Sequence, residues 1–324
     1  MTLLTEGALV AYLRERAASG THQDPDLVLG IGDDAALLLA AADQALAWTT
    51  DSLVAGVHYP PATHPADIGW KTLAVNLSDL AAMGATPRWV SLNLSLPTFE
   101  HDWIVAFCDG FFELAQQHRV GLIGGDCTRA AEAVLTVTAI GQVPVGQALR
   151  RDGGQAGDDV WISGWPGEAA AGLALMDNAA DPQLRRRLDR PTPRIALGLG
   201  LRGLASAALD VSDGLLLDLD RMCAASDCGA QLALEALPIS QSLTQAAADP
   251  SEARAWLLTG GDDYELLFSA PPARRSQVEH LSNRLNLPLH WIGVLTAGTR
   301  VCVRDQTGRE HVFARRGYEH QPAR

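Results

Sequence analysis

The sequence predicts a mixed α/β (α+β) protein with two domains. Apolar residues recur with helical spacing in some segments and with strand alternation in others, and the two kinds of segment are interleaved along 324 residues. A chain of this length is long enough for two domains. Residues 150–158 (RRDGGQAGD) are charged and rich in glycine, as linkers are. We therefore expect one domain over residues 1–149 and a second over residues 150–324.

The N-terminal half alternates between the two periodicities. Residues 133–143 contain the run Val-Leu-Thr-Val-Thr, which favours a strand, and Gly84 is placed to end a helix over residues 67–83. The expected helices are residues 3–18, 67–83 and 102–118, and the expected strands are residues 27–31, 36–40, 45–50, 89–96, 120–123 and 133–143.

The C-terminal half has the same mixed character. The tripeptide GGD occurs at Gly124 and again at Gly260, but no sustained period surrounds either, so no internal repeat is expected. The expected strands are residues 160–163, 230–234, 264–268, 290–294 and 300–303 with a short one ending near Asp210, and the expected helices are residues 167–176, 215–225 and 274–285.

The composition argues against several partners and locations. The chain has 47% hydrophobic and 19% charged residues, as globular proteins do. Its net charge of −13 argues against nucleic acid and anionic membranes as surface partners. No apolar run approaches the roughly 20 residues that cross a bilayer, and the first residues do not resemble a signal peptide. The five cysteines are odd in number and form no C-x-x-C, which favours reduced thiols and a cytoplasmic protein over disulfides or structural zinc.

The most informative feature is a set of aspartates beside glycines or hydroxyl residues. A carboxylate in an apolar stretch is costly unless it is paired or binds a metal, and Lys71 is the single lysine of the chain. Mg²⁺ prefers oxygen ligands and often accompanies phosphates. The motifs therefore predict a carboxylate-lined, Mg²⁺-dependent phosphate site. They are GIGDD (residues 30–34), TTDS (49–52), NLSDLAAMGA (76–85), GGDC (124–127), DVSDG (210–214) and GGDDYE (260–265).

Each motif also has a purely structural interpretation, as a solvated turn, a strand end or a helix cap. The structural interpretation fits Asn76 and Asp79 least well, because they lie three residues apart and so share one face of an apolar helix. DVSDG opens a helix, where Ser212 or Asp213 can act as a cap and where free N–H groups can bind an anion. We expect GGDC to form a loop at a strand end, with glycines that let the backbone approach a ligand.

Several reaction classes lack their motifs. The P-loop, the protein-kinase set, G-x-S-x-G and H-E-x-x-H are all absent from the sequence. Of the nine histidines, His58 alone lies near an aspartate motif. A lone histidine is more often structural than a ligand contact, so both interpretations of His58 stay open.

Taken in order, these segments closely resemble the thiamine-monophosphate kinases, members of a superfamily of ATP-binding proteins similar to aminoimidazole-ribonucleotide synthetase. The resemblance implies a two-domain PurM-like fold, with an N-terminal sheet domain that dimerises and a C-terminal α/β domain. It implies a homodimer that transfers the γ-phosphoryl of ATP to the phosphate of thiamine monophosphate with the help of several Mg²⁺ ions. The matching segments, which span nearly the whole chain, are GIGDDAALL, TTDSLVAGVHY, KTLAVNLSDLAAMGATP, LIGGDCTR, DVSDGL, GGDDYEL and RGYEH.

The resemblance also implies roles for individual residues, without a catalytic acid or base. The implied Mg²⁺ ligands are Asp34, Thr49, Thr50, Asp51, Asp79, Asp126, Asp210 and Asp213. The implied ATP contacts are Gly125, Asp126, Arg151 and Ser212, and the implied thiamine-monophosphate contacts are His58, Asp262 and Tyr318. The sequence departs from the family in three ways: many relatives have Glu in place of Asp262, Cys127 replaces a hydroxyl residue, and Arg150 competes with Arg151 for the ATP role.

The chemistry of such an acceptor agrees with an aspartate-rich site. A phosphate monoester is already anionic near neutral pH, with a second pKa of about 6, so its attack needs no general base. Phosphoryl transfer depends mostly on positioning and on neutralising charge. Two alternatives remain open: another ATP-dependent synthetase of the same superfamily, such as an amidine-forming purine enzyme, and a nucleotide-binding regulator without catalysis.

Overall fold

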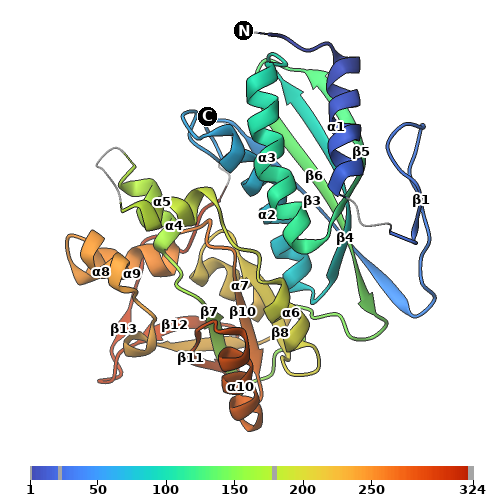
Figure 1. The fold of residues 1–324 in the computed structure, drawn as a ribbon. Helices are drawn as coiled ribbons and strands as arrows, with labels where there is room; N and C mark the ends of the chain where they lie inside the picture. The colour runs from blue at the N-terminus through green and yellow to red at the C-terminus, as the bar shows by residue number, and fades with distance from the viewer. Residues whose placement is uncertain (1, 21–23, 177–180, 320–324) are drawn as a thin grey trace. The chain divides into compact units, whose positions relative to one another are not determined.

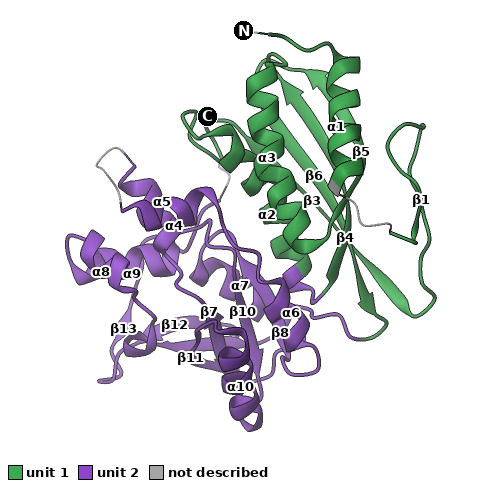
Figure 2. Cartoon of the chain, viewed as in Figure 1, with its two compact units in different colours: residues 1–80, 85–146 green, residues 81–84, 147–324 purple. Residues whose placement is uncertain are grey.

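The chain folds into two compact units. The structure, a computed structural model, describes residues 2–20, 24–176 and 181–319 (Figure 1). Unit 1 comprises residues 1–80 and 85–146, and unit 2 comprises residues 81–84 and 147–324 (Figure 2). Each unit has its own sheet and its own helices.

Unit 1 is built on a four-stranded sheet of order β3-β6-β4-β5. Strand β6 is antiparallel to both of its neighbours, and β4 and β5 are parallel. The helices are α1 (Glu6–Gly20), α2 (Pro65–Ala82) and α3 (His101–His118). The strands are β1 (Leu27–Leu29), β2 (Leu37–Leu38), β3 (Gln44–Val54), β4 (Thr86–Leu96), β5 (Gly121–Arg129) and β6 (Val134–Pro144).

The helices of unit 1 lie on one side of this sheet (Figure 1). Buried apolar side chains of the helices and of the sheet form the core. In β4, Leu92, Leu94 and Leu96 are buried and alternate with half-buried polar residues, as in a strand with one packed face. Helices α2 and α3 approach to backbone contact, since a Cβ added to Gly110 would lie 1.7 Å from the carbonyl oxygen of Ala66. This close crossing holds α2, with its Asn76 and Asp79, against the sheet.

The other side of the sheet is only partly covered, and we call it the open face. The β1–β2 hairpin packs Leu27 and Leu38 against a small cluster that includes Trp89 and Ile140. Trp48 of β3 pairs with Ile140 across the sheet and is 69% exposed. An exposed tryptophan of this size indicates a surface that can meet a partner.

Unit 2 is built on a seven-stranded sheet of order β13-β12-β9-β11-β7-β10-β8, in which only the β9–β12 pair is parallel. The strands are β7 (Asp159–Ser163), β8 (Ala207–Val211), β9 (Gly229–Ala233), β10 (Glu265–Ala270), β11 (Leu289–Thr296), β12 (Val301–Arg304) and β13 (Glu310–His311). The helices are α4 (Glu168–Ala174), α5 (Pro182–Asp189), α6 (Ile195–Leu201), α7 (Leu215–Ala225), α8 (Gln241–Ala246), α9 (Pro250–Thr259) and α10 (Arg275–Leu285), with two short 3-10 turns at Leu234–Ala236 and Pro272–Arg274. None of the helices that the structure describes, in either unit, has the length and apolarity needed to span a membrane.

Alternation along β8 separates the two faces of the unit 2 sheet. Leu209 and Val211 lie in a buried cluster with Leu215 and Leu219 of α7, so α7 packs on that face. Asp210 lies between them in the strand, and its side chain therefore points to the opposite face.

Two motifs lie in strands rather than at strand ends. Strand β3 continues to Val54, so TTDS lies inside it and the expectation that the strand ends there is wrong. Strand β5 continues to Arg129, so GGDC lies inside that strand and is not a loop after residue 123. Pairing with neighbouring strands overrides the weak strand propensity of Gly and Asp at both places.

Four helices of unit 2, α5, α6, α8 and α9, fall in segments for which no element was expected. Three of them, α5, α8 and α9, begin after a residue whose side chain caps the helix. Asp181, Ser240 and Asp249 precede them, and each side chain accepts a hydrogen bond from a backbone N–H group of the first turn. Pro182 and Pro250 follow two of these caps, in the first helical position. The cap-and-proline pattern was the signal that could have predicted these short helices.

Candidate functional site

Residues of β3 and α2 form a group of oxygen atoms on the helix-covered side of the unit 1 sheet. The Thr49 hydroxyl donates to Asp79 Oδ2 at 2.5 Å, and the backbone N–H of Asp51 donates to Asn76 Oδ1 at 3.0 Å. Asn76 is fully buried and Asp79 is half-buried. The expected shared face of Asn76 and Asp79 therefore turns toward β3. We call Thr49, Asp51, Asn76 and Asp79 the β3–α2 cluster.

The donor set of the β3–α2 cluster suits a hard cation. Its two carboxylates, one hydroxyl and one amide oxygen are the ligand types that Mg²⁺ prefers. Among the residues that the structure describes, no three acidic, histidine or cysteine side chains are grouped closely enough to hold a metal ion. The six expected aspartate ligands are divided between the units, with Asp34, Asp51, Asp79 and Asp126 in unit 1 and Asp210 and Asp213 in unit 2.

The side chains of Thr50 and Asp126 lie on the open face and are thus separated from the β3–α2 cluster. Thr50 alternates with Thr49 in β3, and its hydroxyl lies 2.7 Å from that of Thr138 in β6. Asp126 is exposed and alternates with the buried Cys127 of β5. The two-residue period of a strand accounts for both separations.

The GIGDD loop meets β5 in unit 1. A cavity of about 90 Å³ is lined by Ile31 of that loop and by Gly125 and Asp126 of β5, among others. Asp34 itself is exposed, and its backbone N–H donates to Asp33 Oδ1 at 2.8 Å. The structure thus places the implied ATP contact Gly125 near the loop that carries Asp34.

His58 is fixed in the turn that follows β3. Its Nδ1 accepts a hydrogen bond from the N–H of Val54 at 3.0 Å, which places the proton of a neutral ring on Nε2. Its carbonyl oxygen accepts one from Lys71 Nζ at 3.2 Å. Lys71 is only 2% exposed, so the single lysine of the chain supports the turn of an expected substrate contact.

In unit 2, Asp218 of α7 closes the DVSDG loop from inside. Its Oδ2 accepts hydrogen bonds from the N–H groups of Ser212, Asp213 and Gly214 at 3.1, 3.0 and 3.1 Å. Arg221 Nη1 bridges Asp213 at 2.5 Å and Asp218 at 2.7 Å. Burial raises the pKa of the Asp218 carboxyl. These three N–H groups are therefore satisfied inside the protein, which does not favour the interpretation in which they bind an anion.

Three distant segments of unit 2 meet at the backbone of Ser212 and Asp213. The N–H of Asp262 donates to the Ser212 carbonyl at 2.8 Å, and the N–H of Tyr318 donates to the Asp213 carbonyl at 2.9 Å. Asp262 and Tyr264 have φ values of 69° and 51°, a left-handed conformation that costs non-glycine residues about 1–3 kcal/mol each. Unit 2 therefore gathers implied metal, ATP and substrate residues at one loop.

The two arginines at the start of unit 2 differ in their partners. Arg150 binds Asp152 through Nε at 2.9 Å and through Nη2. The carbonyl of Arg151 accepts a hydrogen bond from Ser226 Oγ at 2.8 Å, and no residue that the structure describes pairs with its guanidinium. Arg151 is thus the better placed of the two to bind an external anion.

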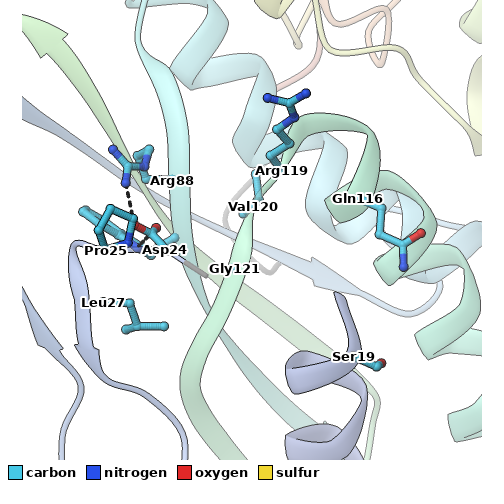
Figure 3. A pocket seen from close by; sticks show the side chains of 10 residues that line it. Ser19, Asp24, Pro25, Leu27, Arg88, Gln116, Arg119, Val120 and Gly121 are labelled. Atoms are coloured by element: carbon cyan, nitrogen blue, oxygen red, sulfur yellow. Dashed lines mark hydrogen bonds and ion pairs between the residues drawn. The ribbon is translucent and has the colours of Figure 1, made fainter. Parts of the chain in front are cut away.

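A larger cavity of unit 1 contains none of the expected site residues (Figure 3). Its volume is about 580 Å³, and Asp24 within it accepts hydrogen bonds from Arg88 Nη2 at 2.7 Å and from Trp89 Nε1 at 2.8 Å. Cavity volume alone therefore does not locate the site in this chain. The lining residues are Ser19, Asp24, Pro25, Leu27, Arg88, Trp89, Gln116, Arg119, Val120 and Gly121.

Asp218 and Lys71 are supporting residues that the sequence analysis did not assign to the site. Both carry a recognisable signal, because each is a charged residue within an apolar helical segment, LLLDL and WKTLAV respectively. Such residues need a buried partner, and the structure supplies it from the loop beside the helix.

Comparison with known proteins shows the family. Residues 32–143 match the family model for the AIR synthase related protein, N-terminal domain, and residues 155–306 match that for the C-terminal domain. The thiamine-monophosphate kinase of Escherichia coli (strain K12) is 44% identical over 323 residues, which cover 97% of this chain and 98% of the relative. This chain belongs to the thiamine-monophosphate kinase family. The resemblance found in the motifs is therefore confirmed.

Solved structures of thiamine-monophosphate kinases confirm the two-domain PurM-like fold. The crystal structure of the enzyme from Stenotrophomonas maltophilia K279a is 50% identical, with a TM-score of 0.85 over 93% of this chain and 97% of that one. AaThiL complexed with AMPPCP and TMP is 29% identical, with a TM-score of 0.78 over 99% of both chains. The family match covers both units, so unit 1 and unit 2 each correspond to one kind of AIR-synthase-related domain.

Proposed function

We propose that this protein transfers the γ-phosphoryl group of ATP to the phosphate of thiamine monophosphate, giving thiamine diphosphate and ADP. The proposal is carried by the 44% identity to a thiamine-monophosphate kinase over nearly the full length. A structural relative that covers 99% of the chain is complexed with AMPPCP, an ATP analogue, and TMP. These relatives favour neither the amidine-forming synthetase nor the regulator without catalysis.

Mg²⁺ is the proposed cofactor, and the oxygen donors of the β3–α2 cluster fit it. When bound, Mg²⁺ neutralises and orients phosphate oxygens. Thr49 donates to Asp79 Oδ2, and Asp51 lies on the same side of β3 as Thr49. The remaining proposed ligands are Asp34, Thr50 and Asp126 in unit 1 and Asp210 and Asp213 in unit 2.

The loop at Ser212 and Asp213 is the proposed meeting point of nucleotide and substrate contacts in unit 2. Because Asp218 occupies its N–H groups, the loop offers side-chain carboxylates rather than amides to a ligand. A phosphate approaches such a loop favourably only when cations offset the negative charge. This supports a cation-mediated role for Asp213.

The remaining proposed contacts follow the family resemblance. Gly125, Ser212 and Arg151 contact ATP, and His58, Asp262 and Tyr318 contact thiamine monophosphate. The protein residues bind and orient the two anions, and none is needed as a base, because the acceptor oxygen is already ionised near neutral pH.

The decisive experiment measures ATP consumption in the presence and absence of thiamine monophosphate. We expect ADP and thiamine diphosphate in equal amounts by phosphorus NMR, with activity lost on chelation by EDTA and restored by Mg²⁺. ATP binding without turnover would support the regulator. Release of inorganic phosphate without a diphosphate product would support a synthetase.

We further propose that the open face of unit 1 forms a homodimer interface. Trp48 and Leu46 of β3 are 69% and 48% exposed there, and exposed apolar side chains on a sheet face favour association. We expect Trp48→Asp to convert a dimer into a monomer, as measured by sedimentation equilibrium. Leu173→Asp, a change of an exposed leucine on α4 of unit 2, is the matched control and should leave the mass unchanged. A wild-type monomer would refute the proposal directly.

A cytoplasmic location is proposed from the cysteines. All five are free thiols in the structure, and four are buried. Reduced, unpaired cysteines are typical of proteins in reducing compartments.

A further inference from the structure

The C-terminal segment, residues 314–318, is attached to the first turns of α7. The carbonyl oxygen of Arg316 accepts a hydrogen bond from the N–H of Leu217 at 3.0 Å. The N–H of Tyr318 donates to the carbonyl oxygen of Asp213 at 2.9 Å. The segment thus satisfies one of the N–H groups that a helix start leaves unpaired, and it contacts the loop that carries a proposed metal ligand.

In addition to these backbone hydrogen bonds, a side-chain ion pair holds the segment against α7. Arg316 binds Asp220 of α7 in a bidentate manner, with Nη2 at 2.7 Å from Oδ1 and Nε bonded to Oδ2. The two side chains are 40% and 34% exposed. Bidentate geometry fixes orientation as well as distance, so the pair defines how the backbone of residue 316 enters the contact.

Gly317 shows how closely the segment approaches the loop. A Cβ added there would lie 2.7 Å from the carbonyl oxygen of Asp213 and 2.7 Å from the Cβ of Leu217. The contact therefore tolerates no side chain at this residue. Tyr318, the next residue, is 49% exposed, and its backbone N–H is bonded to the carbonyl oxygen of Asp213.

We propose that the Arg316–Asp220 pair is a positioning device for Tyr318, which sets the affinity for thiamine monophosphate without contacting it. This inference rests on the proposed function, in which Tyr318 contacts that substrate. The pair links α7 to the C-terminal segment, and the Tyr318–Asp213 hydrogen bond links the segment to the DVSDG loop. The proposed substrate contact, Tyr318, and the proposed metal ligand, Asp213, are thereby held together at the N-terminus of α7.

A purely structural pair would behave differently from a positioning pair. Partly exposed ion pairs contribute little to overall stability, so breaking this one should leave the unfolding transition nearly unchanged. It should instead release the chain beyond Phe313, where the described residues, up to 319, form no regular element after β13. Release lowers the fraction of molecules in which Tyr318 is in place. The apparent affinity for thiamine monophosphate falls in proportion to that fraction.

The kinetic test compares Asp220→Asn, Arg316→Gln and Arg316→Lys with the wild type. We expect the first two to raise KM for thiamine monophosphate by roughly 3- to 10-fold, with KM for ATP and kcat changed less than twofold. Arg316→Lys keeps the positive charge, so its KM for thiamine monophosphate should lie between those of Arg316→Gln and the wild type. Arg315→Gln is the matched control, because Arg315 is an exposed neighbour with the same charge, and its kinetics should equal those of the wild type.

A second measurement does not depend on activity. In Asp220→Asn, the peptide that contains Tyr318 should exchange its amide hydrogens faster than in the wild type, because the bond to Asp213 opens more often. An unchanged rate of amide hydrogen exchange in this peptide, together with an unchanged KM for thiamine monophosphate, would overturn the positioning role. Equal rises in both KM values together with a lower melting temperature would identify the pair as structural instead. A wild type that exchanges as expected but does not phosphorylate thiamine monophosphate would refute the proposed function and leave the attachment of the segment intact.

Discussion

Asp79→Asn should lower kcat on the order of 10²- to 10³-fold while the protein stays folded. The change keeps the shape of the side chain and still accepts a hydrogen bond from Thr49. It removes a negative charge that would offset the proposed cation of the β3–α2 cluster. Because phosphoryl transfer depends on neutralising phosphate charge, the loss should appear mainly in kcat, measured by the coupled release of ADP.

Asp210→Asn in unit 2 should have the same effect, since Asp210 is also a proposed metal ligand. Asp102→Asn is the control for both, because Asp102 is fully exposed at the start of α3. Circular dichroism should show native spectra for all three variants. Wild-type kcat in both Asp79→Asn and Asp210→Asn would remove the metal-site interpretation.

The helical part of the site was predictable from the sequence because helix spacing is local. Asn76 and Asp79 lie three residues apart and share one helix face as expected, and in the structure both contact the same strand, β3. The part of the site that lies on a strand was less predictable. The resemblance implied both Thr49 and Thr50 as Mg²⁺ ligands, whereas alternation along β3 sends their hydroxyls to opposite faces of the sheet.

The remaining differences come from partners that are distant in sequence or from competition within one loop. The strand order of the unit 2 sheet joins β7, β10 and β11 across more than a hundred residues, and no local pattern encodes such pairing. At DVSDG, an external phosphate and Asp218 are two candidate acceptors for the same N–H groups. The internal carboxylate occupies them in the structure, because it is covalently tethered and loses little entropy on binding.

Arg194→Met should destabilise unit 2 by about 3–5 kcal/mol, the usual effect of leaving a buried charge without its partner. Glu265 is 4% exposed and binds Arg194 through Nε at 2.6 Å and through Nη2, and it also accepts from Ser163 Oγ at 2.5 Å. Urea unfolding measures the decrease in the free energy of unfolding. Arg300→Met is the matched control, because the Arg300–Glu310 pair is largely exposed and should contribute at most about 1 kcal/mol.

The pH dependence of stability should identify Glu265 as the charged partner. Burial alone would raise the pKa of Glu265, but attraction to Arg194 and hydrogen bonds from Arg194 and Ser163 outweigh burial, and the pKa is lowered. A lowered folded-state pKa stabilises the protein above the unfolded-state value of about 4.3 and loses that contribution as pH falls through the folded value. Arg194→Met should therefore flatten the acid limb of the stability curve. The double variant Arg194→Met with Glu265→Leu should regain most of the lost stability, because no buried charge then lacks a partner. A double variant as unstable as Arg194→Met would mean that packing, and not the charge of Glu265, causes the loss.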